Sequence, residues 1–178
     1  MERNEKGMKN KFLLSIMMAF AFILVVGCSS EDSSKEESSD DSKVSEEDVK
    51  SEMLDFYLSL ANTINANDTA LNTYELSEEP DTLTDEDKAA ASESAKATAD
   101  ALGKVEVPKA LSNYKKNLDV ATEAIQTSYS KKAEILAGNS SEKLEDANES
   151  FNLGSEMIND IFEELGLTPV SLNAEVNS

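Results

Sequence analysis

The chain has 178 residues, of which 36 are acidic and 16 are basic, and its net charge is −20. A field of that sign repels nucleic acid and anionic lipid headgroups, so it excludes DNA and RNA binding and favours cations or basic partners. The chain has no histidine and only one cysteine. These counts exclude an intramolecular disulfide, Ser-His or Cys-His catalysis, and metal or haem ligation by histidine.

The first 28 residues have the organisation of an export signal. Four of the first eleven residues are basic, and an apolar run over residues 12–27 follows and ends at Cys28. This run matches the length of a signal-peptide core and lies at the short edge of what spans a bilayer. Its end, Val25-Val26-Gly27-Cys28, resembles the lipobox of bacterial lipoproteins.

The lipobox resemblance implies that the chain is cut before Cys28 and that the Cys28 thiol is diacylated. The protein would then be lipid-anchored in the cell membrane and face outside the cytoplasm. A Lys- and Asn-rich composition favours a Gram-positive-type envelope. The alternative is an uncleaved membrane helix with a free thiol at its outer end. Lipidation is favoured because the run is short for a retained span and polar sequence begins at Ser29.

Residues 28–44 are predicted to form a disordered acidic linker, because they contain almost no apolar side chain to bury. Residues 1–27 contribute a net charge of +2, so the remaining chain carries −22. The predicted organisation is a signal peptide over 1–27, a lipid-anchored linker over 28–44, a helical domain over 45–167 and a C-terminal tail over 168–178.

The first helix is predicted to begin after Ser45, where Asp48 completes a weak capping box. Apolar residues then recur every three or four positions, which places them on one helix face. We expect this helix to extend to about Leu76, with a possible break near residues 65–68, before a loop over residues 78–81. The stripe consists of Val49, Met53, Phe56, Leu60, Ile64, Leu71 and Tyr74.

The second helix is predicted to begin after Thr84, with acidic residues in its first turn. Residues 88–102 are rich in alanine, and Gly103 has the position of a C′ glycine. A helix with so few large apolar side chains either packs closely on its neighbours or packs weakly and faces a partner. Close packing is the favoured interpretation.

The third helix is predicted to begin at Pro108 and to end at Gly138-Asn139. The fourth is predicted to begin at Ser140 or Ser141 and to end at Gly166, with Leu167 in contact beyond the glycine. Both helices carry regular apolar stripes. The third stripe is Leu111, Tyr114, Leu118, Ala121, Ile125, Tyr129, Lys132 and Leu136, and the fourth is Leu144, Ala147, Phe151, Gly154, Ile158, Ile161 and Leu165, with Met157 and Phe162 beside it.

Four amphipathic helices joined by short loops predict an all-α fold, specifically an antiparallel up-down four-helix bundle. Part of the tail is expected to lie along the bundle. Gly154 lies on the buried stripe, where it either admits a neighbouring helix or aromatic ring or is a weak spot that costs about 1 kcal/mol relative to alanine.

The segments 107–114 and 151–166 are similar to those of small helical lipoproteins of unknown function in Gram-positive bacteria. That similarity implies a helical extracytoplasmic domain and no functional residue. We found no phosphate-binding loop, calcium-loop spacing or paired catalytic carboxylates in the sequence. The sequence therefore predicts no cofactor and no catalytic or metal site, and Cys28 lipidation is the one predicted site.

Two functions remain open from the sequence. The favoured one is a non-catalytic module that binds an envelope protein or a wall component. The alternative is a lipoprotein that binds a small ligand or cation and is associated with a transporter. An enzyme is the third choice, because the acidic residues lie mainly on predicted polar faces.

Overall fold

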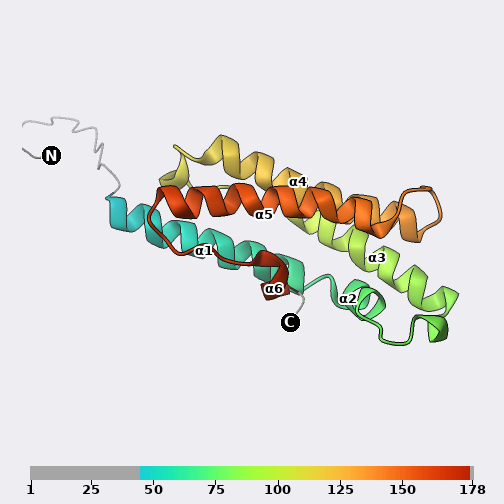
Figure 1. The fold of residues 1–178 in the computed structure, drawn as a ribbon. Helices are drawn as coiled ribbons and strands as arrows, with labels where there is room; N and C mark the ends of the chain where they lie inside the picture. Colours follow the sequence, from blue (N-terminus) through green and yellow to red (C-terminus); the bar gives the residue numbers. More distant parts are fainter. Residues whose placement is uncertain (1–44, 177–178) are drawn as a thin grey trace, which may run out of the picture. The chain divides into compact units, whose positions relative to one another are not determined.

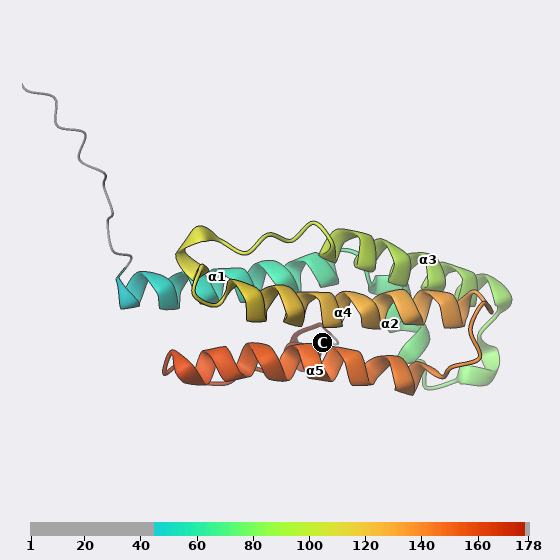
Figure 2. The same ribbon diagram turned by 90° about the horizontal axis from the view of Figure 1, so that it is seen from above.

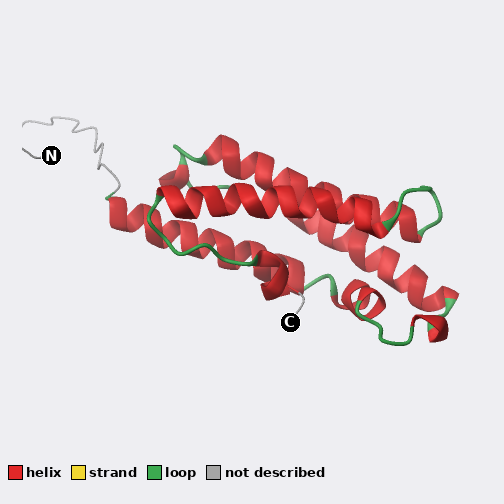
Figure 3. Cartoon of the chain, viewed as in Figure 1, coloured by secondary structure: helices red, strands yellow, loops and turns green. Residues whose placement is uncertain are grey.

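The computed structural model describes residues 45–176, and all regular structure in that range is helical. Figure 3 shows this helical content, which confirms the all-α prediction. The predicted signal peptide, Cys28 and the linker lie outside the described residues. The helices are α1 (Glu46–Asn65), α2 (Thr69–Glu75), α3 (Asp85–Leu102), α4 (Lys115–Leu136), α5 (Leu144–Glu164) and α6 (Leu172–Val176), with 3-10 turns η1 (Pro80–Thr82) and η2 (Lys109–Leu111).

The long helices α1, α3, α4 and α5 run in alternating directions (Figures 1 and 2). Side-chain contacts place α1 beside the C-terminal end of α5, where the Tyr57 and Phe162 rings meet edge to face with centroids 5.6 Å apart. The helix α3 packs on α4, and Ser92 Oγ donates to the Ala133 carbonyl at 2.8 Å. One hydrophobic core runs between these helices.

The first helix does not run unbroken to Leu76: it is interrupted near residues 65–68, the alternative that the sequence left open, and a side chain of α3 bonds the interruption. Asp68 ends the turn that follows α1 and precedes α2, and Leu71 N and the Asn67 carbonyl there bond a side chain of another helix. The Ser94 hydroxyl on α3 accepts from Leu71 N at 3.3 Å and donates to the Asn67 carbonyl at 2.7 Å. One buried hydroxyl therefore satisfies two backbone groups that the break would otherwise leave unpaired.

The predicted N-terminal caps of α1 and α3 are confirmed. Ser45 Oγ accepts from Asp48 N at 3.1 Å, and Thr84 Oγ1 accepts from Asp87 N at 3.1 Å. In each case the acidic side chain also bonds the backbone N–H of the capping residue. The two capping boxes fix where these helices begin.

The predicted start of the third helix at Pro108 is wrong. Pro108 is extended and precedes η2, where Leu111 N bonds the Pro108 carbonyl at 3.0 Å in the tighter 3-10 pattern. The first i to i−4 bond of α4 is from Leu118 N to the Tyr114 carbonyl. The tighter turn brings Leu111, which is fully buried, into the core beside α1.

The predicted start of the fourth helix at Ser140 or Ser141 is also wrong, because α5 begins at Leu144. Ser140 Oγ accepts from Glu142 N in a local turn at 3.2 Å, so it does not cap a helix. Lys143 N instead donates to Asp146 Oδ2 at 3.0 Å. The helix therefore begins one turn later than predicted.

Glycine ends α4 and α5 as predicted. Gly138 and Gly166 have φ values of 78° and 68°, in the left-handed region that favours glycine. Beyond Gly166, Leu167 N bonds the Phe162 carbonyl at 2.8 Å, and Leu167 packs against the core. Gly103 is different: its φ of −64° is right-handed, so the predicted C′ conformation is wrong although α3 does end before it.

Gly154 admits a neighbouring helix, as one of the two interpretations predicted. A Cβ at this position would lie 2.5 Å from the Ala121 carbonyl oxygen and 2.6 Å from Ile125 Cγ1. Real Cβ atoms do not approach other atoms so closely, so the missing side chain sets the distance between α4 and α5. The other residues of the α5 stripe are buried or partly buried, as predicted.

The segment predicted as a C-terminal tail contains α6, and its Leu172 and Val176 are buried. Amide side chains hold this segment in place. Asn65 Nδ2 donates to the Glu175 carbonyl at 3.3 Å, and Asn72 Nδ2 donates to the Val176 carbonyl at 2.8 Å. The end of the described chain is thus tied to the break between α1 and α2.

Candidate functional site: a buried polar cluster and an acidic helix face

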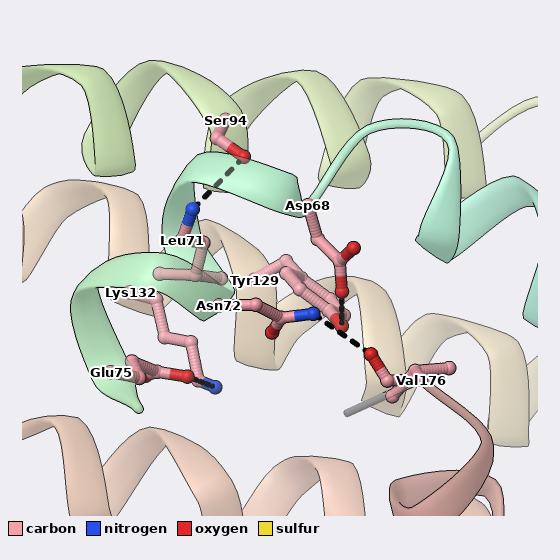
Figure 4. Close-up of polar contacts among 8 residues, drawn as sticks. All are labelled: Asp68, Leu71, Asn72, Glu75, Ser94, Tyr129, Lys132 and Val176. Carbon is pink, nitrogen blue, oxygen red and sulfur yellow. Dashed lines mark hydrogen bonds and ion pairs between the residues drawn. The ribbon is translucent and has the colours of Figure 1, made fainter. Parts of the chain in front are cut away.

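A polar cluster lies where α2 faces α4. Asp68, Asn72 and Glu75 are separated by four and three positions, so they share one side of α2. They face Tyr129 and Lys132, which are three positions apart on α4. Figure 4 shows this arrangement. We call these five residues the polar cluster.

Asp68 and Tyr129 form the inner half of the polar cluster. Tyr129 Oη donates to Asp68 Oδ2 at 3.3 Å, and both residues are almost completely buried. Burial raises the pKa of Asp68, because the ionised carboxylate loses its hydration. Burial and the nearby Asp68 charge both raise the pKa of Tyr129, which keeps its phenol protonated as a hydrogen-bond donor.

Lys132 and Glu75 form the outer half. Lys132 Nζ lies 2.8 Å from Glu75 Oε2, and the two side chains are 8% and 18% exposed. Lys132 also lies over the Tyr129 ring, with its ammonium 5.6 Å from the ring centroid. The second carboxylate oxygen, Glu75 Oε1, is buried and has no hydrogen-bond donor within the described chain. Both charged groups have lost much of their hydration, so removing one of them leaves the other charge without compensation.

Two open cavities flank the polar cluster. One, of about 370 Å³, is lined by Glu75, Lys132, Leu144, Glu145 and Asn148 together with Leu76 and Asn173. The other, of about 410 Å³, lies beside Asp68 and Asn72 and is bordered by Val176 of α6. Within residues 45–176, no group of three or more acidic or cysteine side chains is placed to hold a metal ion.

The sequence prediction did not identify the polar cluster as a unit. Tyr129 and Lys132 were assigned to the core stripe of α4, and Asp68 was noted only at the expected break. One signal was present: a lysine on an apolar stripe needs a buried partner. The sequence could not show which acid meets Lys132, because Glu75 is 57 positions away.

The outer side of α5, unlike the polar cluster, carries exposed charges of a single sign. The helix contains no lysine or arginine, and all its acidic side chains are exposed. Among the described residues, no lysine or arginine forms an ion pair with any of them. Elsewhere, acids pair with a lysine one turn away, as Asp119 does with Lys115 at 2.8 Å. The acids of α5 are Glu145, Asp146, Glu149, Glu156, Asp160, Glu163 and Glu164.

This arrangement is electrostatically unfavourable for the isolated helix. Three like-charged pairs are four positions apart on α5, and each such pair costs about 0.2–0.5 kcal/mol. Glu163 and Glu164 also lie in the last turn, where the helix dipole favours cations. The residues involved in the pairs are Glu145 with Glu149, Glu156 with Asp160, and Asp160 with Glu164.

Comparison of the chain with protein-family models, with curated proteins and with solved structures finds no match. The one predicted site residue, Cys28, lies outside the described residues. In the part of the chain that the structure describes, no helix has both the length and the apolar character needed to cross a membrane.

Proposed function

We propose that this chain is an extracytoplasmic lipoprotein, anchored in the cell membrane through Cys28, that acts as a non-catalytic interaction module. Its partner would be another envelope protein or a wall component. The observation that carries this proposal is the outer side of α5, which presents seven exposed acids and no basic residue. Charge that the fold leaves unpaired at an energetic cost is available to a partner.

The polar cluster supports the same assignment. Asp68 bonds Tyr129, and Glu75 pairs with Lys132, so the titratable groups of the interior bond one another. Together with the amide bonds from Asn65 and Asn72, they fix α2 and α6 to the other helices. These interactions support a structural role for the polar cluster.

Crosslinking in intact cells tests the interaction module. A protein or wall fragment captured by the full chain, and absent when the chain is deleted, is the expected result. The anchor is tested separately with Cys28→Ala. We expect this variant to remain unprocessed or to be released into the medium. An unchanged membrane fraction, mobility and lipid label would contradict the lipobox interpretation.

The second candidate function is binding of a small cation or amine by a lipoprotein associated with a transporter. The unpaired Glu75 Oε1 and the neighbouring cavity with Glu145 and Asn148 favour it. A thermal-shift titration of the full chain with Ca²⁺ and with a diamine tests this function. A rise in Tm at millimolar concentration that Glu145→Gln reduces would support it, and no shift with either probe would reject it.

We further propose that α1, α3, α4 and α5 form an up-down four-helix bundle, to which α2 and α6 are additions. The alternating directions of these helices and the α1 to α5 ring contact support this arrangement. Distances between spin labels on α1 and α5 test it. Labels at Leu54 and Leu153 should give one narrow distance distribution, and a broad distribution would contradict a bundle.

A further inference from the structure

We propose that the solvent side of the α4 and α5 pair, centred on Leu153 and Val120, is the docking surface for a basic amphipathic helix of a partner protein. This inference rests on the proposed function and specifies the surface and the kind of partner. We call the surface the α4–α5 face. It consists of Leu153 and Val120 with the acids around them.

Leu153 and Val120 lie next to the close contact of α4 and α5 at Gly154. Gly154 faces Ala121 across the contact, and Leu153 and Val120 each precede the contact residue by one position. One position is a rotation of about 100° in a helix. Because α4 and α5 are antiparallel (Figures 1 and 2), the two rotations direct both side chains to the same side of the pair.

That side faces solvent. Leu153 is 54% exposed and Val120 is 43% exposed. One turn beyond Leu153 on α5, Met157 is partly buried against the core and extends the apolar surface. The glycine contact keeps the helices close, so the apolar residues form one shallow strip rather than two separated positions.

Acids surround the strip at helical spacings. Glu149 and Glu156 are four positions before and three positions after Leu153, which puts them on the same side of α5. Asp146, Asp160 and Glu164 continue this side at both ends. On α4, Lys116 lies four positions before Val120, so the surface combines a small apolar centre with a border that is acidic along α5 and carries one lysine on α4.

Charge complementarity decides the occupant. A helix with an apolar stripe bordered by lysine and arginine fits the apolar centre and neutralises the acidic border. Anionic lipid is repelled by the same border. A second copy of this chain would bring α5 acids against α5 acids, so it is also disfavoured.

Photo-crosslinking in intact cells tests the α4–α5 face with the full chain. A benzophenone amino acid replaces Leu153 in one variant and Leu58, an exposed leucine of α1, in the control. We expect the Leu153 variant to form an adduct with a protein segment that has apolar residues every three or four positions and flanking lysine or arginine. We expect the Leu58 variant not to form that adduct.

Charge variants test whether adduct formation depends on the acids of the α4–α5 face or on the net charge of the whole chain. The triple variant Glu149→Gln, Glu156→Gln and Asp160→Asn should lower the adduct yield about tenfold at equal protein abundance. The matched variant Glu78→Gln, Glu79→Gln and Asp81→Asn changes net charge equally, on an exposed loop, and should leave the yield unchanged. The α5 variant should also melt no lower than the parent, which excludes unfolding as the cause.

The outcomes distinguish the two proposals. Adducts at Leu58 but not at Leu153, an adduct with an acidic or uncharged segment, or an unchanged yield in the α5 variant would overturn the α4–α5 face and leave the interaction module intact. If neither position, nor general crosslinking, captures any protein or wall fragment, the interaction module itself is rejected.

Discussion

The polar cluster and the acidic side of α5 differ in the burial and in the pairing of their charged side chains. In the cluster, the buried Lys132 has its Nζ 2.8 Å from Oε2 of the partly buried Glu75, and Asp68 accepts from Tyr129. On α5 the acids are exposed, and among the described residues no lysine or arginine pairs with them. One region matches every buried charge with a partner, whereas the other accumulates charge of a single sign.

The difference follows from what each environment requires. A buried charge without a partner loses its hydration at a cost of several kcal/mol, which favours an oppositely charged or hydrogen-bonding partner for each charged group of the cluster. An exposed carboxylate stays hydrated, and repulsion between neighbours costs only tenths of a kcal/mol. The cluster therefore stabilises the fold, whereas the α5 charges oppose it slightly and are free to engage a partner.

The largest expected effect comes from unpairing the buried charge. Lys132→Met should lower the free energy of unfolding by up to about 3–5 kcal/mol, because Glu75, whose side chain is only 18% exposed, is left without its cation. Urea unfolding of the full chain measures this. The double variant Lys132→Met with Glu75→Leu should recover most of the loss. If the single and double variants were equally destabilised, loss of packing rather than loss of pairing would be the cause.

The stripes and caps could be predicted from the sequence because their causes are local. Spacing of three and four placed Met53, Leu118 and Ile158 in the core, and Thr84 with Asp87 fixed the start of α3. The starts of α4 and α5 were mispredicted, because Pro108 and Ser140 each satisfy a helix-start rule and a turn rule. Contact of Leu111 with the core and a local bond of Ser140 decided between them.

The candidate site was less predictable, because it depends on residues distant in the sequence. Ser94 bonds the break between α1 and α2 from 23 positions away, and nothing in its alanine-rich surroundings indicates that partner. The acids of α5 were visible as a polar face. Whether a lysine or arginine of a neighbouring helix pairs with them depends on how the helices pack, which the sequence does not show.

Adjacent residues of α5 separate its packed side from its exposed side. Gly154→Ala should lower the free energy of unfolding by about 1–3 kcal/mol, because the new Cβ overlaps Ala121 and Ile125. Leu153→Ala, one position away and 54% exposed, should change it by less than about 0.5 kcal/mol. Thermal and urea unfolding measure both variants. Equal effects would mean that the helix contact adjusts to the extra methyl group.

The contribution of Asp68 to the free energy of unfolding should depend on pH. Its folded-state pKa is raised by burial, so between the unfolded value of about 3.9 and the raised value the folded state keeps a proton that the unfolded state releases. Stability from this group is present at low pH and is lost as pH rises through that window.

Asp68→Asn should remove this dependence. The stability of the variant relative to the parent should rise with pH above about 4, by at most about 1.4 kcal/mol per pH unit, and then level off. Urea unfolding across pH measures it. Asp81→Asn, in an exposed turn, is the control and should run parallel to the parent. A falling relative stability would show that Asp68 is more stable as the carboxylate.

The smallest effect tests whether the α5 charges oppose folding. The variant Glu163→Gln with Glu164→Gln removes two negative charges from the last turn of α5, where the carbonyl ends of the helix are already negative. It should raise the free energy of unfolding by about 0.3–1 kcal/mol at low ionic strength, and salt should reduce this gain. Glu86→Gln removes one negative charge from the first turn of α3, where the helix end is positive, and should lower the free energy of unfolding. Differential melting of the three proteins at low and high salt measures both effects. A loss of stability in the α5 variant would mean that Glu163 and Glu164 already have a stabilising partner within the chain, and Glu164 would then not be an unpaired charge of the α4–α5 face.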